Sequence, residues 1–303
     1  MKFLIFIDYG QPRLGLLLGD NKVIALAELL GLFPDHGLAK IPTCINELIM
    51  LGDKGTDIIQ NCLNKGVPDI QMRLLDDVQV LPPLKMTKNV FCVGRNYRDH
   101  IIEGNLARGR PADAFPEAIE FFSKPPTAVV GHRANVCRYA KLTDTLDYEV
   151  ELAIVIGTRG KNISRNDALK HVFGYTIVND ITARNLQQLH GQWLKGKSLD
   201  TTCPMGPVVV HHSAIDNANN LDVSLTLNGE LRQSDNTSSM IFSIEAIIEQ
   251  LSAGMTLEPG DVIATGTPKG VGFAMTPPSC LKTGDVVSAS VQHVGTLTNT
   301  ISD

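Results

Sequence analysis

Three acidic residues in the middle of the chain have the types and spacing that suit a divalent metal ion. Glu149 and Glu151 lie in the string LDYEVELAIVIG, and Asp180 ends the string VFGYTIVND. Because alternate side chains of a β-strand project from the same face, Glu149 and Glu151 should lie side by side. Such a pair repels unless a cation or a proton lies between the carboxylates. Three carboxylates would make an oxygen site for Mg²⁺, Mn²⁺ or Ca²⁺. The pattern equally fits the solvated face of an antiparallel strand, so both interpretations stay open here.

His100 and Glu103 form a second pair that could do chemistry, in the string RNYRDHIIEGN. Three residues apart, they would share one face of a helix. A carboxylate bound to one ring nitrogen fixes the tautomer and makes the other nitrogen a better general base. A surface His–Glu pair is the alternative. The polar, Gly- and Pro-containing residues 104–118 that follow fit either a surface loop or an active-site lid. The eight histidines show no zinc-binding spacing, so zinc is not expected.

The elements that must position these residues change in character near Pro82–Pro83. Before that point, strands alternate with helical stretches: a first strand turns at Gly10, a hairpin follows at Gly19–Asn21, and residues 45–66 have helical spacing. We therefore expect a small α/β N-terminal domain over residues 1–82.

Residues 83–303 consist mainly of short β-branched runs separated by Gly, Asp and Pro. The Asn228-Gly229 pair between alternating runs predicts a hairpin. Residues 240–255 predict one amphipathic helix. The second domain should therefore be strand-rich, with a sandwich or barrel-like core, and the whole chain α+β.

Bulk properties exclude several classes of partner. The formal net charge of −5 argues against a nucleic acid, which would favour a basic surface. The first apolar run, residues 3–7, is far shorter than the roughly 20 residues of a membrane span. No signal-peptide cleavage pattern follows it. Six scattered cysteines without C-x-x-C then indicate reduced thiols, and the cytoplasm is the expected location.

The chain resembles the fumarylacetoacetate hydrolase family. The resemblance covers roughly residues 83–295 and rests on an ordered set of strings: FCVGRNYRDHIIEGN, EFFSKPPTAVVGH, LDYEVELAIVIG, VFGYTIVNDITARNLQ, KGKSLDTTCPMGPVVV, LNGELRQ and GDVIATGTPKGVGF. It implies a mixed β-roll or β-sandwich catalytic domain, usually assembled as a homodimer, with a small N-terminal domain found only in some members.

The resemblance also assigns roles to individual residues. It implies that the metal ligands are Glu149, Glu151 and Asp180, and that His100 and Glu103 activate water. Lys197, in the string KGKS, matches a lysine that meets the substrate carboxylate or the developing charge. Lys124 is expected to hold a turn. Four further residues are expected to line the substrate pocket: Arg95, Arg184, Gln187 and Thr267.

The function expected from these assignments is Mg²⁺- or Mn²⁺-dependent cleavage of a C–C bond in a small 2-oxo acid. Oxaloacetate decarboxylation and hydrolysis of an acylpyruvate or fumarylpyruvate are the two forms considered, with the ion acting as a Lewis acid toward an enolate. The pair His100 and Glu103 favours cleavage over isomerisation, which needs no activated water. The alternatives are an isomerase or hydratase of 2-hydroxymuconate-type diacids, and a non-catalytic metabolite-binding protein with the same fold.

Overall fold

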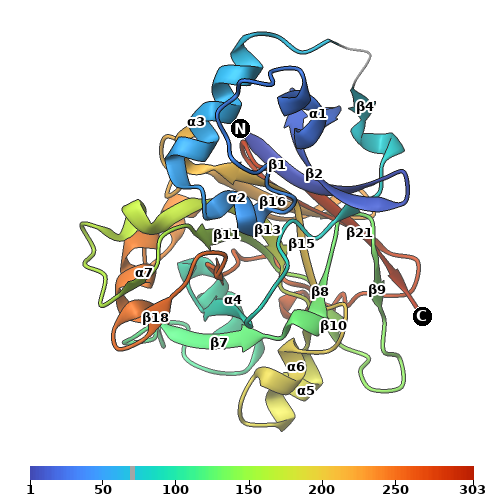
Figure 1. The fold of residues 1–303 in the computed structure, drawn as a ribbon. Coiled ribbons are helices and arrows are strands. Elements are labelled where there is room, and N and C mark those ends of the chain that lie inside the picture. The colour runs from blue at the N-terminus through green and yellow to red at the C-terminus, as the bar shows by residue number, and fades with distance from the viewer. Residues whose placement is uncertain (69–71) are drawn as a thin grey trace.

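Two β-sheets packed face to face form most of the molecule (Figure 1). The computed structural model describes residues 1–68 and 72–303. The larger sheet has, in order, β4 (Arg73–Leu74), β3 (Lys22–Ala25), β2 (Gln11–Leu18), β1 (Lys2–Asp8), β15 (Cys203–His211), β13 (Val172–Asn179), β11 (Val150–Ile156), β19 (Val262–Ala264), β6 (Val90–Gly94) and β7 (Glu120–Lys124). Two short strands join it at the side, β5 (Val80–Leu81) beside β1 and β8 (Val129–Val130) beside β15.

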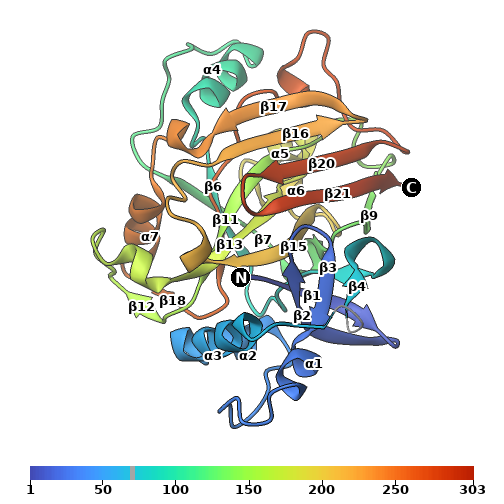
Figure 2. The ribbon, with the colours of Figure 1, turned by 90° about the horizontal axis from the view of Figure 1, so that it is seen from above.

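The smaller sheet lies over the middle of the larger one (Figure 2). Its strands are, in order, β17 (Glu230–Asn236), β16 (Asp222–Leu227), β20 (Val286–Val291), β21 (Gly295–Ser302) and β9 (Asn135–Cys137). β16 and β17 are joined by the predicted hairpin, in which Asn228 and Gly229 both have positive φ. Two short pairs complete the strands: β10 (Leu146–Asp147) with β14 (Thr182–Ala183), and β12 (Gly160–Lys161) with β18 (Thr256–Leu257).

The central strand β11 is buried on both faces, which explains why VELAIVI is apolar almost throughout. Its alternate residues Leu152 and Ile154 pack into the core between the two sheets. Ala153 and Val155 belong to a second core, on the side of the N-terminal helices. The strand-rich α+β class predicted from the sequence is confirmed.

The N-terminal strands continue the larger sheet. β1 pairs with β15, with Phe3 opposite Val209, and the predicted turns at Gly10 and Gly19–Asn21 are confirmed. The helical spacing over residues 45–66 gives two helices rather than one. The helical run is interrupted at Gly52. Its φ of +59° is left-handed, so α2 cannot continue through it. The α-helices among the described residues of this region are α1 (Leu26–Gly31), α2 (Ile45–Ile49) and α3 (Gly52–Asn64).

Four helices belong to the rest of the chain: α4 (Arg98–Ala107), α5 (Arg184–Leu189), α6 (Leu194–Lys197) and α7 (Ile244–Ser252). The prediction that a helix begins at residue 240 is wrong. α7 begins at Ile244, because the Ser243 hydroxyl caps it by accepting from the Ala246 N–H at 3.4 Å. Within the described residues, no helix has the length and apolar character that crossing a membrane requires.

Candidate active site

The three predicted metal ligands meet at one end of the two central strands. β11 and β13 run antiparallel with Val150 opposite Asn179, so the residue before β11 and the residue after β13 lie at the same edge. The Asp180 N–H donates to the Glu149 carbonyl oxygen at 2.8 Å. One carboxylate oxygen from each of Glu149, Glu151 and Asp180 lies within 4.8 Å of the other two. The three residues are 4%, 2% and 0% exposed, so the interpretation of a solvated strand face is wrong.

Buried cations from three elements compensate two of these carboxylates. Lys197 Nζ, at the end of α6, lies 2.7 Å from Glu149 Oε2 and 2.6 Å from Asp180 Oδ2. Arg184 Nη2 lies 2.7 Å from Glu149 Oε1, and Lys124 Nζ lies 2.7 Å from Asp180 Oδ1. Although burial opposes ionisation, Lys197 and Arg184 hold the pKa of Glu149 well below its usual range.

Glu151 lacks such a partner. Its carboxylate accepts a hydrogen bond from the Gly266 N–H at 2.9 Å, and among residues 1–68 and 72–303 no cationic side chain lies within ion-pair distance of it. Burial, and then the charges of Asp180 and Glu149, raise the pKa of Glu151. A divalent cation shared by the cluster would supply the missing positive charge. The buried, all-oxygen donor set therefore fits Mg²⁺ or Mn²⁺.

The predicted His–Glu pair lies on one face of α4. His100 Nδ1 is 2.9 Å from Glu103 Oε1, and Glu103 Oε2 also accepts from the Gly270 N–H at 2.9 Å. Because the carboxylate is held from two sides, it favours the tautomer with the proton on Nδ1 and leaves Nε2 free as a base. The helix and the contact are confirmed, and the catalytic role stays a prediction.

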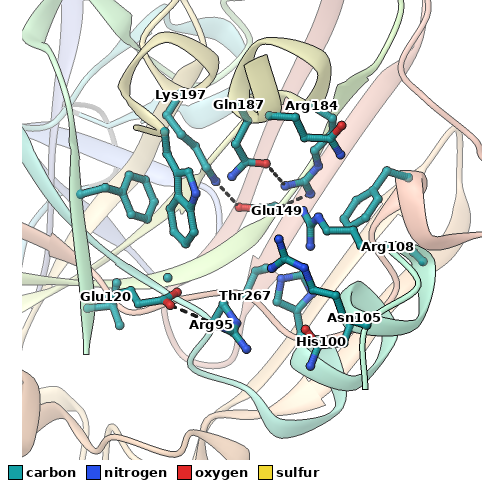
Figure 3. A pocket seen from close by; sticks show the side chains of 18 of the residues that line it. Arg95, His100, Asn105, Arg108, Glu120, Glu149, Arg184, Gln187, Lys197 and Thr267 are labelled. Carbon is teal, nitrogen blue, oxygen red and sulfur yellow. Dashed lines mark hydrogen bonds and ion pairs between the residues drawn. The ribbon is translucent and has the colours of Figure 1, made fainter. Parts of the chain in front are cut away.

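A cavity of about 650 Å³ is lined by His100 of this pair and by Glu149 and Glu151 of the carboxylate cluster. Figure 3 shows Glu149, Lys197 and Arg184 on one wall and His100 on another, formed by α4. All four residues expected to line a pocket do line this cavity: Arg95, Arg184, Gln187 and Thr267.

Two of these lining residues have their side chains fixed by neighbours. Arg95, which has a left-handed φ of +55°, pairs with Glu120 at 3.1 Å. The Thr267 hydroxyl oxygen accepts from Gln233 Nε2 at 2.8 Å, so its own proton can be donated into the cavity.

Arg108, just after α4, is a cavity residue that sequence reasoning missed. Its guanidinium lies 4.7 Å from the ring centroid of Phe273, and the guanidinium of Arg184 lies 4.4 Å from the same ring. Arg108 Nη1 donates to the Gly104 carbonyl at 3.2 Å, but no carboxylate in the described part of the chain pairs with it. Burial, and then repulsion from Arg184 and Arg110, lower its pKa to about 10. The cavity thus contains a cation without an acidic partner, which suits an anionic ligand.

Two residues that hold the carboxylate cluster in position were not fully predicted: Asp147 was missed, and only part of the role of Lys124 was expected. Asp147 is fully buried and accepts from Arg184 Nε at 2.9 Å. Its signal was present, because Asp147 continues the alternation of Glu149 and Glu151. Lys124, which was expected to hold a turn, donates to the carbonyl oxygen of residue 181, in the connection between β13 and β14, at 3.0 Å, and it also orients Asp180. That second contact joins residues 56 positions apart and left no local signal.

Comparison with known proteins decides the family. Residues 89–302 match the family profile described as fumarylacetoacetate (FAA) hydrolase C-terminal. The chain belongs to the fumarylacetoacetate hydrolase family. Its place in this family of enzymes agrees with the ordered strings and with the fold.

Similar members of the fumarylacetoacetate hydrolase family extend over nearly the whole chain. Oxaloacetate tautomerase YisK of Bacillus subtilis is 47% identical, over 99% of this chain and 100% of that protein. A mitochondrial oxaloacetate tautomerase of Xenopus laevis is 35% identical, over 97% of this chain and 87% of the relative. The solved structure of a fumarylacetoacetate hydrolase from Exiguobacterium antarcticum is 39% identical and superposes with a TM-score of 0.82, over 100% of this chain and 99% of that one. The expected family fold is confirmed over the N-terminal region as well.

Proposed function

We propose that this protein is a divalent-metal-dependent enzyme that interconverts the enol and keto forms of oxaloacetate. The observation that carries the proposal is the position of His100, oriented by Glu103, across one cavity from Glu149 and Glu151 of the carboxylate cluster. The reaction moves one proton between the oxygen on C2 and carbon C3. It therefore needs a proton carrier beside groups that stabilise negative charge on oxygen. The two relatives named as oxaloacetate tautomerases support this choice of substrate.

Glu149, Glu151 and Asp180 would hold the Mg²⁺ or Mn²⁺ ion. When bound, the ion would supply Lewis-acid polarisation of the 2-oxo group, which makes the protons on C3 more acidic. Lys197 uses two of its three N–H donors on Glu149 and Asp180. The third donor is available to the substrate, at the place where negative charge develops on oxygen.

His100 would carry the proton. Its Nδ1 is engaged by Glu103, so Nε2 is the nitrogen that meets the substrate. In ketonisation, protonated Nε2 gives its proton to C3, and the proton released from the C2 hydroxyl restores the imidazolium. The reverse reaction takes the proton from C3 and returns one to oxygen. Glu103 stabilises the imidazolium without leaving its bond to Gly270.

Arg108 would bind the carboxylate at the far end of oxaloacetate, on C4. Its guanidinium lies in the cavity wall without an acidic partner among the described residues. Pairing with a carboxylate would offset both the burial and the repulsion from Arg184 and Arg110 that lower its pKa. The proposal therefore favours a dicarboxylate over a monocarboxylate such as pyruvate.

Cleavage of a C–C bond, the reaction expected from the sequence, is the second candidate. The free Nε2 of His100 could take a proton from a water molecule that attacks the distal carbonyl of an acylpyruvate. Decarboxylation of oxaloacetate would leave an enolate that the same cations stabilise. The similarity to a fumarylacetoacetate hydrolase supports this alternative.

One NMR experiment separates the two reactions. Enol oxaloacetate is mixed with the Mg²⁺-loaded protein, and the enol, keto and pyruvate signals are followed together. We expect the enol to convert to the keto form much faster than without protein, with no extra pyruvate over many turnovers. Pyruvate appearing as fast as the enol disappears would instead establish decarboxylation. If neither rate changes, and an acylpyruvate is also left intact, both candidates are rejected.

A further inference from the structure

A group of two histidines and one aspartate lies away from the cavity, where the N-terminal region meets the larger sheet. His211 ends β15, and His212 begins the short helical turn His212–Ala214. Adjacent side chains of a continuing strand would point to opposite faces. Because the strand stops here, the two rings lie instead on the same side, with centroids 4.3 Å apart.

Asp53, in the first turn of α3, reaches this histidine pair from a distant part of the sequence. Its Oδ1 lies 4.0 Å from His211 Nε2 and 3.7 Å from His212 Nε2. The three ligand atoms all lie within 4.8 Å of one another. In the described part of the chain, neither Nε2 atom has a hydrogen bond that would have to be broken before it could bind something else.

The His211 ring is already held in position. Phe173 packs edge-on against it at a centroid distance of 5.2 Å. Its Nδ1 lies 2.8 Å from the Ser213 hydroxyl oxygen, which can accept a hydrogen bond from the Nδ1–H and leave the Nε2 lone pair directed at Asp53 and His212. The longer contact from the Ser213 N–H, at 3.4 Å, would need the opposite tautomer. A ligand on Nε2 would therefore select the Nδ1–H form.

We propose that Asp53, His211 and His212 form a second metal site, distinct from the carboxylate cluster, that takes a borderline transition-metal ion of the Zn²⁺ class. Bonds of about 2.0–2.1 Å place tetrahedral ligand atoms about 3.3 Å apart, so the Asp53 oxygen, now 4.0 Å and 3.7 Å from the two nitrogens, must approach both of them, and Asp53 and His212 must adjust. Both can, since their side chains are 82% and 41% exposed. Water completes the coordination from the solvent side. The ion ties α3 to the end of β15.

The chemistry of the ligands separates the two sites. Two imidazole nitrogens with one carboxylate favour Zn²⁺ over Mg²⁺, whereas the carboxylate cluster offers only oxygen. Saturating Mg²⁺ should therefore occupy the cluster and leave the second site open to Zn²⁺. The absence of zinc-type spacing in the sequence does not bear on this site, because its aspartate comes from another element.

Calorimetric titration of Zn²⁺ into the Mg²⁺-saturated protein tests the proposal. We expect one Zn²⁺ per chain, with affinity reduced at least tenfold by Asp53→Asn and by His212→Asn. Asp57→Asn, on the exposed face of the same helix, and His293→Asn, at an exposed left-handed position that Asn tolerates, serve as matched controls and should bind Zn²⁺ like the parent protein. Because the ion binds only the folded chain, Zn²⁺ should also raise the Tm of the parent and of both controls, but not of His212→Asn.

Three outcomes would overturn the proposal. The first is that the Mg²⁺-saturated protein binds no Zn²⁺. The second is that Asp53→Asn and His212→Asn bind it as tightly as the parent does. The third is that Zn²⁺ binding disappears in Glu151→Gln but persists in His212→Asn, which would assign the ion to the carboxylate cluster.

Discussion

At the scale of single residues, charge is distributed unevenly over the carboxylate cluster. Lys197 bridges Glu149 and Asp180, and Lys124 and Arg184 add further contacts to the same two acids. Glu151 has a backbone N–H and no cation within ion-pair distance among the described residues. Its buried negative charge is therefore the one that gains most from a bound metal ion.

Glu151→Gln should separate metal binding from folding. The amide oxygen can still accept from Gly266, while the uncompensated charge is removed, so the metal-free variant should be at least as stable as the parent. We expect Mg²⁺ to raise the Tm of the parent but not of the variant, and turnover to fall by roughly a hundredfold or more. A variant with the parent's response to Mg²⁺ would show that Glu151 does not hold the ion.

Arg108→Gln should weaken binding of a dicarboxylate selectively. Losing a charge-assisted contact of about 1.5–3 kcal/mol should raise KM for oxaloacetate by roughly ten- to a hundredfold. Exchange of the C3 protons of pyruvate in deuterated water, followed by NMR, should change much less because pyruvate lacks the distal carboxylate. Arg98→Gln, exposed at the start of α4, the helix that Arg108 follows, is the control. Equal losses with both substrates would contradict the assigned contact.

The alternation of acids on one strand predicted that Glu149 and Glu151 lie side by side, but the resemblance to the family was needed to favour a metal site, with Asp180 as third ligand, over a solvated strand face. Lys124 and Arg108 carry no comparable pattern. Lys124 contacts a carboxylate 56 residues further along the chain. Arg108 packs on the ring of Phe273, whose position depends on the whole fold. Contacts of this kind follow from tertiary structure and cannot be found by local spacing.

At the scale of elements, the antiparallel pairing of β11 and β13 brings the acids at the start of β11 next to Asp180 at the end of β13. The sequence indicated both strands by their β-branched, apolar runs. A helix carrying His100 and Glu103 was assumed in pairing these residues and was not indicated by periodicity, and the structure places both on α4. Boundaries that depend on a single backbone conformation were missed. The left-handed Gly52 separates α2 from α3, and the Ser243 cap makes α7 begin at Ile244 rather than at Met240.

The connection between β8 and β9 should respond to pH through His132. Its Nδ1 accepts from the Thr298 N–H of β21 at 3.1 Å, and burial, followed by Arg133, lowers its pKa to about 4. Because the unfolded ring binds a proton near pH 6.5 and the folded ring only near pH 4, stability should fall as the pH drops across this range. The loss should reach about 2 kcal/mol, allowing for the partial exposure of the ring.

The free energy of unfolding of the parent and of His132→Asn is measured by denaturation at several pH values. The Asn side-chain oxygen can accept a hydrogen bond from the same Thr298 N–H, and Asn does not titrate. The parent should lose more stability than the variant between pH 6.5 and pH 4, because the two proteins have all other titratable groups in common. Parallel curves for the two proteins would mean that His132 has a similar pKa in the folded and unfolded chain.

At the scale of the whole molecule, the N-terminal region and the rest share one sheet and one core. β1 pairs with β15, and Phe3 and Leu16 pack in the same cluster as Val155 and Val209. The expected boundary near residue 82 marks a change in sequence character, but the sheet runs across it. This continuity comes from a pairing some 200 residues apart, which sequence periodicity does not reveal.

A chain that begins at residue 83 should therefore fold poorly. It would expose the edge of β15 and the apolar face that the N-terminal strands and helices cover. We expect aggregation or a broad thermal transition, against a single cooperative transition for the full chain. A shortened protein with the Tm and activity of the full chain would show that the two regions are independent.

The most direct test of the central claim is turnover of enol oxaloacetate after exhaustive chelation. One oxygen of each of the three buried carboxylates lies within 4.8 Å of the other two, and the proposed reaction requires that this cluster bind a cation. We predict that ketonisation falls to the rate without protein and returns when Mg²⁺ or Mn²⁺ is added in excess. Full turnover in the chelated protein, verified to be free of metal, would contradict the account.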